Sequence, residues 1–302
     1  MVTNQGNFKR ERLRKGDWIF IITILLLPML GFAAMYVAVN VRSILMSFQT
    51  TIDGVKYSWV GLDNIKKSFV SIFTDVDMKN ILGNSFKMWF VGSIVMQGIT
   101  LFFSYAVWKK MFGAKFFSII LFLPSLLPSV VFSMLGRQAI NYAIPAIFGD
   151  GLGLLNEQGP GFAIVLGYGC VLGFGSNLVL QLGAMSGVST DVVEYGRLDG
   201  MNSWQEFIHI VFPHIFPTLI SLFVMSVPTL FSNYGLLFDF FGEYPSSFVK
   251  TFGLEAYSVT LRPNGHLLYC SISATGLILS VFSVALSLCG RRLLERIGPK
   301  ED

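Results

Sequence analysis

The 302-residue chain contains little charge: Asp, Glu, Lys and Arg make up 13% of it, against about 25% in a typical soluble domain. It also contains only three cysteines and three histidines. Cys170, Cys270 and Cys289 all lie in apolar segments, which argues against a disulfide framework and favours small packing side chains. The histidines show no spacing typical of metal ligands. The composition therefore excludes a soluble globular protein and predicts no metal site.

Motifs for catalysis are also missing. The sequence has no Gly-x-x-x-x-Gly-Lys run to hold nucleotide phosphates, and no Ser/His/Asp or Cys/His arrangement typical of nucleophilic catalysis. We therefore expect a chain that hydrolyses no nucleotide by itself, has no catalytic residues and binds no cofactor. The net charge is +4, and the basic residues concentrate beside the ends of apolar segments, where they would meet anionic lipid if those segments cross a membrane. This charge gives no reason to expect nucleic acid as a partner.

Long apolar runs dominate the sequence, since 53% of its residues are hydrophobic. A membrane-crossing helix needs about 20 mostly apolar residues. The runs are continuously apolar rather than alternating, which favours helices over the strands of a membrane barrel. We expect an all-α membrane protein with about six transmembrane helices. The six segments are approximately Trp18–Val41, Ile81–Trp108, Phe116–Leu135, Gly161–Met185, Ile215–Leu237 and Leu267–Cys289.

Basic residues predict the orientation of these spans. If the N-terminus is cytoplasmic, 13 of the 22 Lys and Arg residues face the cytoplasm, as the positive-inside rule requires, and the C-terminus is cytoplasmic too. The first span is too long for a signal-peptide core and is predicted to be an uncleaved anchor. The expected parts are a basic cytoplasmic tail at 1–17, a first span and extracellular loop at 18–80, a membrane core at 81–290 with a cytoplasmic loop at 186–214, and a cytoplasmic tail at 291–302.

The loop between the fourth and fifth runs carries two signals for the start of a helix. Asp191 stands three residues before Glu194, and Ser203 stands three residues before Glu206. These are the spacings of an N-cap residue with its reciprocal carboxylate. The Asp-Gly pair at 199–200 predicts a turn, because glycine accepts the positive φ that a helix end requires. The sequence therefore predicts two short cytoplasmic helices joined by a turn.

The same loop resembles the cytoplasmic signature of ABC importer permeases. That pattern is Glu-Ala-Ala, three residues, Gly, nine residues, Ile, one residue, an apolar residue and Pro. Glu194, Gly200, Ile210, Phe212 and Pro213 fall at these spacings.

Two positions depart from the pattern, because Tyr195 and Gly196 replace the alanines, and a glycine lowers helix stability by about 1 kcal/mol relative to alanine. The resemblance implies that residues 191–199 form a coupling helix that docks in a cleft of an ATPase subunit. The alternative is an ordinary amphipathic loop. The expected coupling residues are Glu194, Tyr195, Gly196, Asp199 and Gly200.

A second motif narrows the resemblance. Gly61-Leu62-Asp63-Asn64, before the second run, is similar to a run in the sugar-type permeases of the maltose and glycerol-phosphate importers. The chain thus resembles a permease subunit of a carbohydrate ABC importer with the type I importer fold. The resemblance implies a heterodimer with a second permease, two ATPase subunits that hold ATP and magnesium, an extracellular solute-binding protein, and a bacterial or archaeal plasma membrane.

Polar side chains lie within the fourth and fifth runs, where contact with lipid alone would not require them. Asn177 and Gln181 are four residues apart and so share one helix face, and Ser226, Asn233 and Tyr234 follow in the fifth run. Amides and hydroxyls suit sugar hydroxyls, and aromatic faces suit the apolar side of a sugar ring. We expect these five residues to line a substrate path. Hydrogen bonding between helices alone is the alternative explanation for each of them.

Prolines predict irregular spans. Pro124 and Pro128 in the third run predict a broken or bent helix, which would be a gate or a packing kink, and Pro228 predicts a kink in the fifth run.

Other functions stay open on the sequence alone. A permease for a non-sugar solute would share these motifs. An ion-coupled secondary transporter would need ionisable residues in the middle of its spans. The apolar runs hold none there, and Lys87 lies near an edge where its side chain can reach water. A membrane scaffold would not need the polar faces of the fourth and fifth runs.

The predicted orientation can be tested by labelling. In a background with the three native cysteines replaced by alanine, single cysteines at Asp63 and Asp150 should react with an impermeant thiol reagent in intact cells. A cysteine at Ser203 should react only after the membrane is opened. Labelling of the Ser203 position from outside would contradict the orientation.

Overall fold

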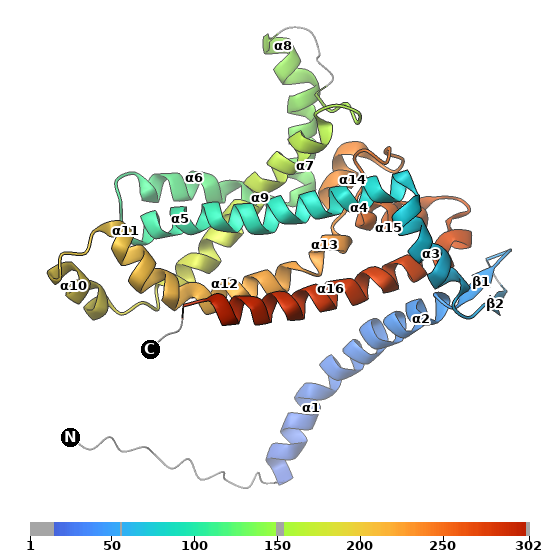
Figure 1. Ribbon diagram of the computed structural model, residues 1–302, viewed down its shortest axis with the longest axis horizontal. Helices are drawn as coiled ribbons and strands as arrows, with labels where there is room; N and C mark the ends of the chain where they lie inside the picture. The colour runs from blue at the N-terminus through green and yellow to red at the C-terminus, as the bar shows by residue number, and fades with distance from the viewer. Residues whose placement is uncertain (1–14, 55, 149–153, 300–302) are drawn as a thin grey trace.

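The computed structural model describes residues 15–54, 56–148 and 154–299 and places most of them in helices that run along one long axis (Figure 1). The short helices of the 186–214 loop lie at one end of this axis, and a small hairpin lies at the other. The predictions for residues 1–14 and 300–302, and the labelling position Asp150, fall outside the described residues.

The first half of the chain forms an N-terminal arm, a hairpin followed by a short helix, and two long helical segments. The arm is α1 (Lys15–Gly31), η1 (Phe32–Val37) and α2 (Ala38–Met46). The hairpin is β1 (Gln49–Thr51) and β2 (Tyr57–Trp59), and the short helix is α3 (Asp63–Thr74). The second span is α4 (Val76–Trp89), η2 (Phe90–Val95) and α5 (Met96–Trp108). The third segment is α6 (Ala114–Leu126), α7 (Ser129–Gln138), η3 (Ala139–Ala143) and α8 (Ile144–Phe148).

The second half contains the remaining spans and the short helices that connect them. The fourth span is α9 (Gly161–Met185), and α10 (Thr190–Leu198) follows it. The fifth span is α11 (Ser203–Glu206), η4 (Phe207–Val211), α12 (Phe212–Ser226), α13 (Thr229–Ser232) and α14 (Gly235–Phe241). The chain then forms α15 (Phe252–Leu261), η5 (Gly265–Leu268) and α16 (Tyr269–Ile297).

Six apolar spans were expected, and the structure supports that number with one irregular member. By length and composition, five helices are long and apolar enough to cross a membrane: Phe20–Met46, Val76–Trp108, Gly161–Met185, Ser203–Phe241 and Gly265–Ile297. The third predicted span is instead a helix pair bent by 100°.

The bend lies where the two prolines predicted a broken helix. Pro124 is inside the last turn of α6, and Leu127 then takes an extended backbone with ψ 143°. This follows from Pro128, whose ring disfavours helical geometry in the residue before it. A new helix starts at Ser129. Consequently α7 and α8 leave the bundle at a steep angle to α6 (Figure 1).

The hairpin is an addition to the expected all-helical fold. β1 and β2 are antiparallel, with Gln49 opposite Trp59 and Thr51 opposite Tyr57. The stacked rings of Phe48 and Trp59 lie 5.6 Å apart beside it. Three-residue strands of this kind carry too little pattern for the sequence to predict them.

The core consists of small clusters between spans rather than one centre. At the end of the bundle that carries α10, Leu101 and Tyr105 of α5 pack with Met185, Val211 and Ile215. At the opposite end, Val165, Leu237, Phe240 and Leu254 form a second cluster with Ile140. Much of the remaining apolar surface is exposed, as expected for helices solvated by lipid.

Candidate functional site

The predicted coupling helix is α10, and it presents an apolar stripe to its surroundings. Val192, Tyr195 and Leu198 stand three residues apart on one face and are 50%, 69% and 82% exposed. Val193 and Gly196 face the other way and are buried. An exposed stripe of large apolar side chains on a short helix at the end of the bundle is typical of a protein-docking surface. The side chain of Glu194 is exposed beside this stripe.

Gly196 allows α10 to pack closely on the start of the fifth span. A Cβ atom at this position would lie 2.9 Å from Cδ1 of Ile210 and 3.1 Å from Sδ of Met201. Both contacts are with flexible side-chain ends, so the alanine of the related pattern would require only small shifts. The glycine therefore matches the requirement for a small residue at this position.

Gly200 is the turn residue that the sequence predicted. Its φ of +80° lies in the left-handed region that disfavours residues with a Cβ. Its amide donates to the carbonyl of Arg197 at 3.0 Å, and the amide of Met201 donates to that of Gly196 at 3.0 Å. Asp199 is the C-terminal cap of α10. These bonds fix the angle at which the chain leaves α10.

Both predicted N-caps are wrong by one or two residues. Ser189, with an extended backbone, precedes α10, and Asp191 lies inside the first turn, where its charge favours the helix dipole. α11 is capped by Asn202, whose side chain accepts from the Gln205 amide while the Gln205 side chain accepts from Asn202. Asn202 is an equally good cap and lies one residue before the predicted Ser203.

Glu206 has a different role from the capping one that its spacing suggested. It is the only charged side chain that is buried in the part of the chain that the structure describes, with 2% exposure. Its Oε2 lies 3.0 Å from Nζ of Lys109 and 3.4 Å from Nε of Arg197. Its Oε1 accepts from the hydroxyl of Tyr105 at 3.1 Å. The Lys109 side chain is 19% exposed and that of Arg197 is 54% exposed, so Lys109 is the main partner of this carboxylate. Removing one partner of a buried ion pair commonly costs about 3–5 kcal/mol.

Two of the predicted path residues are held by other helices. Gln181 is 1% exposed, donates to the Gln97 carbonyl at 3.1 Å and accepts from the Ser104 hydroxyl at 3.3 Å. Ser226 donates to the Phe223 carbonyl at 2.8 Å and accepts from Nε1 of Trp89 at 3.2 Å. These contacts fit the alternative that sequence reasoning left open, which was hydrogen bonding between helices.

Asn177, half-buried on the same helix as Gln181, makes no side-chain hydrogen bond within the described ranges.

Asn233 and Tyr234 lie at a break in the fifth span, between α13 and α14. The break follows the kink that Pro228 predicted. It leaves the Asn233 carbonyl without a partner in its own helix, and this carbonyl accepts from the Thr251 hydroxyl at 2.8 Å. The Tyr234 ring stacks on that of Tyr257 with centroids 4.4 Å apart. Broken helices expose backbone polar groups, and membrane proteins tolerate them where they line a cavity.

A cavity of about 560 Å³ opens at this break. Asn233 and Tyr234 line it from the fifth span, Ser129 from the start of α7, and Tyr257 from α15. Sequence reasoning missed Ser129 and Tyr257 as lining residues. Ser129 follows the predicted Pro128 and could have been found as the first residue after the break. Tyr257 lies in an outer connection, and no local signal identifies it.

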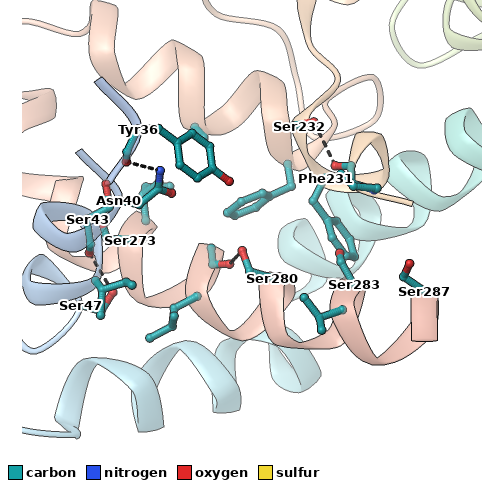
Figure 2. Close-up of a pocket in the computed structure, with 18 of the residues that line it drawn as sticks. Tyr36, Asn40, Ser43, Ser47, Phe231, Ser232, Ser273, Ser280, Ser283 and Ser287 are labelled. Carbon is teal, nitrogen blue, oxygen red and sulfur yellow. Dashed lines mark hydrogen bonds between the residues drawn. The ribbon is translucent and has the colours of Figure 1, made fainter. Parts of the chain in front are cut away.

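A second cavity is a groove of about 650 Å³ between the N-terminal arm and α16. Figure 2 shows Tyr36, Asn40 and Ser43 of the arm on one side of it, and serines of α16 on another. Some of its polar donors are satisfied by their own helices: Asn40 donates to the Tyr36 carbonyl at 2.7 Å, and Ser280 donates to that of Gly276 at 2.7 Å. The groove therefore presents small side chains, several of them serine hydroxyls, along α16.

Neither cavity is a metal centre. Within residues 15–54, 56–148 and 154–299, no three His, Cys, Asp or Glu side chains come together in a way that could hold an ion. The three cysteines are free thiols: Cys270 is buried, Cys170 is half-buried and Cys289 is exposed.

Comparison with solved structures defines the fold. The chain superposes with a TM-score of 0.72 and 17% sequence identity on a chain of a bacterial ABC transporter that imports the acidic polysaccharide alginate, covering 94% of this chain and 97% of that one. A second structure of a bacterial alginate ABC transporter, with a periplasmic protein that carries an alginate pentasaccharide, gives a TM-score of 0.71 at 16% identity, covering 95% and 98%. The fold is therefore that of an ABC importer membrane subunit.

The sequence defines the family. Residues 98–301 match the model of the binding-protein-dependent transport system inner membrane component, so the chain belongs to this family of transport permeases. It is 25% identical to the multiple sugar-binding transport system permease protein MsmF of Streptococcus mutans, covering 82% of this chain and 85% of that protein. It is 26% identical to the maltodextrin transport system permease protein MalC of Streptococcus pneumoniae, covering 76% and 58%. The chain thus spans little more than half of the longer relative.

Proposed function

We propose that this chain is the permease subunit of an ATP-driven importer for a neutral sugar or oligosaccharide. The observation that carries the proposal is α10: a short helix at the end of the bundle, fixed by Gly196 and Gly200, that exposes an apolar stripe with Glu194 at the family spacing. Such a helix is suited to enter a cleft of an ATPase subunit, which would hold the ATP and magnesium that this chain has no motif to bind.

Coupling in this proposal is mechanical. Closure of two ATPase subunits on ATP draws their clefts together, and α10 moves with the cleft that holds it. The spans attached to α10 then reorient, so that the substrate cavity opens to the other side of the membrane. Glu194 supplies a charge-assisted hydrogen bond to the cleft, and Tyr195 supplies apolar contact. Gly196, Asp199 and Gly200 hold the angle of the helix.

The substrate class follows from the cavity at the break of the fifth span. A stacked tyrosine pair offers aromatic faces to a sugar ring, while Asn233 and Ser129 offer an amide and a hydroxyl to its hydroxyl groups. The lining contains one carboxylate, Asp239, and no Lys or Arg. An acidic polysaccharide would meet no opposite charge there, so a neutral sugar fits better. Relatives named for multiple sugars and maltodextrin support this choice.

An extracellular solute-binding protein delivers the sugar in this proposal. The family description, which refers to binding-protein-dependent transport, supports such a partner.

A second permease subunit is also part of the proposal. The N-terminal arm lies apart from the bundle over much of its length, and its apolar side chains, such as Leu27 and Met35, are largely exposed (Figure 1). The groove beside it is suited to a partner helix, because small residues on α16 repeat at alternating spacings of three and four and would let another helix approach closely. The small residues that line the groove are Ser273, Gly276, Ser280, Ser283 and Ser287.

Import of a non-sugar solute is the second candidate, because α10 would serve any substrate equally. An ion-coupled transporter has less support, since the buried Glu206 lies at the cytoplasmic end of the bundle, paired with Lys109, rather than in mid-span.

The coupling assignment predicts the effect of two substitutions. Glu194→Arg reverses the charge that faces the cleft, and Gly200→Asp strains a backbone with φ +80° by about 1 kcal/mol. Each variant should insert into the membrane normally but lose sugar uptake, and Glu194→Arg should also recover less ATPase subunit when the chain is purified. Glu243→Arg, in an exposed outer loop, is the matched control and should keep both. Normal uptake by both variants would remove α10 from the coupling role.

The cavity assignment separates two groups of polar residues. Asn233→Ala removes one neutral hydrogen bond to sugar, worth about 0.5–1.5 kcal/mol, and should reduce uptake of some oligosaccharides about two- to tenfold and leave others unchanged. Gln181→Ala and Ser226→Ala break contacts between helices and should lower protein stability and uptake of every sugar alike. Val179→Ala, on an exposed face of α9, is the control.

The measurement compares uptake of two oligosaccharides with ATPase activity stimulated by the binding protein. Asn177 and Tyr234 are the two remaining candidates and are tested in the same series. Wild-type uptake of every substrate by Asn233→Ala, Tyr234→Ala and Asn177→Ala would place the path elsewhere.

A further inference from the structure

Glu206 joins α10 and α11, which are neighbours in the sequence, to the end of α5, where Lys109 lies 97 residues before Glu206. Arg197, near the end of α10, reaches its Oε2 at 3.4 Å. Lys109, which follows α5, reaches the same oxygen at 3.0 Å, and the Tyr105 hydroxyl of α5 reaches Oε1 at 3.1 Å. Glu206 itself ends α11, which continues into the fifth span. One carboxylate thus connects α10, the fifth span and the second span.

A second set of bonds fastens α11 to α5. The Tyr105 hydroxyl also lies 2.7 Å from the Ser203 carbonyl, and Nζ of Lys109 donates to the Ser203 hydroxyl at 2.8 Å. The ring of Phe207 lies 5.0 Å from that of Tyr105 and 5.6 Å from that of Phe102. These contacts hold α11 on α5 without the carboxylate. The link from α10 to α5 that runs through Arg197, in contrast, depends on the charge of Glu206.

We propose that Glu206 is a positioning residue that makes α10, α11 and the end of α5 move as one body. This rests on the proposed function, in which α10 is driven by an ATPase. A displacement of α10 alone would pull Arg197 away from a buried carboxylate, and the carboxylate cannot leave Lys109 and Tyr105 without losing its remaining partners. The displacement is therefore passed to the second span as well as to the fifth.

Glu206→Gln is the informative variant, because it keeps the volume of the side chain and removes its charge. Its amide has one acceptor oxygen, and its NH₂ group would face the donors of Lys109 and Arg197. The aromatic contacts of Phe207 remain, so α11 is expected to stay on α5. The matched control is Glu295→Gln, which breaks the exposed pair of Arg291 and Glu295 (2.7 Å) on α16.

The first measurement is the distance between spin labels at Thr190 on α10 and Phe112 after α5, in the purified full chain without native cysteines. Both side chains are exposed, and neither belongs to the junction. The unaltered chain and Glu295→Gln should give one narrow distance distribution, and Glu206→Gln should give a broad one. A narrow, unchanged distribution in Glu206→Gln would overturn the proposal.

The second measurement uses the complex with its ATPase. Glu206→Gln should still co-purify with the ATPase and keep basal hydrolysis. Stimulation by the binding protein and sugar uptake should both fall by about tenfold, within the range typical of coupling between linked sites. Stimulation and uptake at the level of the unaltered chain would contradict the transmission role.

The double variant Lys109→Met with Glu206→Gln separates transmission from simple stabilisation. It removes a cation together with the buried charge, so thermal stability should recover relative to Glu206→Gln, while uptake should stay low. Recovery of both would show that Glu206 only stabilises the fold. If no ATPase co-purifies with the unaltered chain, the proposed function is wrong. The distances between the spin labels would still decide whether Glu206 ties α10 to α5.

Discussion

The hydrocarbon of a bilayer offers no hydrogen-bond partner, and this constraint governs the structure of the chain. Each backbone amide and carbonyl in a span must find its partner within a helix, at a cost of several kcal/mol if it does not. The spans are accordingly continuous except at a few places, which are marked by proline or by polar residues. The helix breaks after Leu126 and after Ser232 are such places. Where helices break, polar groups gather, and the break of the fifth span lines a cavity.

The same constraint bears on the buried charge at the end of the bundle that carries α10. Glu206 can be buried there because Lys109, Arg197 and Tyr105 all reach it. A carboxylate placed at mid-span would lack such partners. These contacts tie the end of α10 to α11 and α5, while the apolar stripe of α10 stays exposed. The docking role that we propose for α10 needs such a connection, because force applied to a loose loop would be lost in local movement.

Periodicity and composition predict the parts of this molecule that depend on local sequence. Five apolar runs became long helices, Pro124 and Pro128 produced the bend, and Gly200 took the positive φ that its turn required. The caps were displaced because the sequence offers competing cap residues nearby: Asn202 forms a capping box with Gln205 in place of Ser203, and Ser189 precedes α10 in place of Asp191.

Partners distant in the sequence could not be predicted. Lys109 lies 97 residues before Glu206, and Tyr257 is brought to Tyr234 only by the packing of α15. Gln181 and Ser226 likewise looked available for substrate because the residues that bind them, such as Trp89, come from other spans. Sequence reasoning therefore located the short helix for which we propose the coupling role and the broken span, but it could not separate cavity-lining groups from those that join helices.

The most direct measurement of the central claim is transport by a purified complex in proteoliposomes. The chain would be reconstituted with the companion permease and ATPase that we propose, with the solute-binding protein outside and, as substrate, a labelled sugar that this binding protein holds. We predict that uptake requires both ATP on the ATPase side and the binding protein. An imposed proton or sodium gradient should not substitute for ATP. Uptake driven by such a gradient without ATP, or uptake that does not depend on the binding protein, would contradict the account.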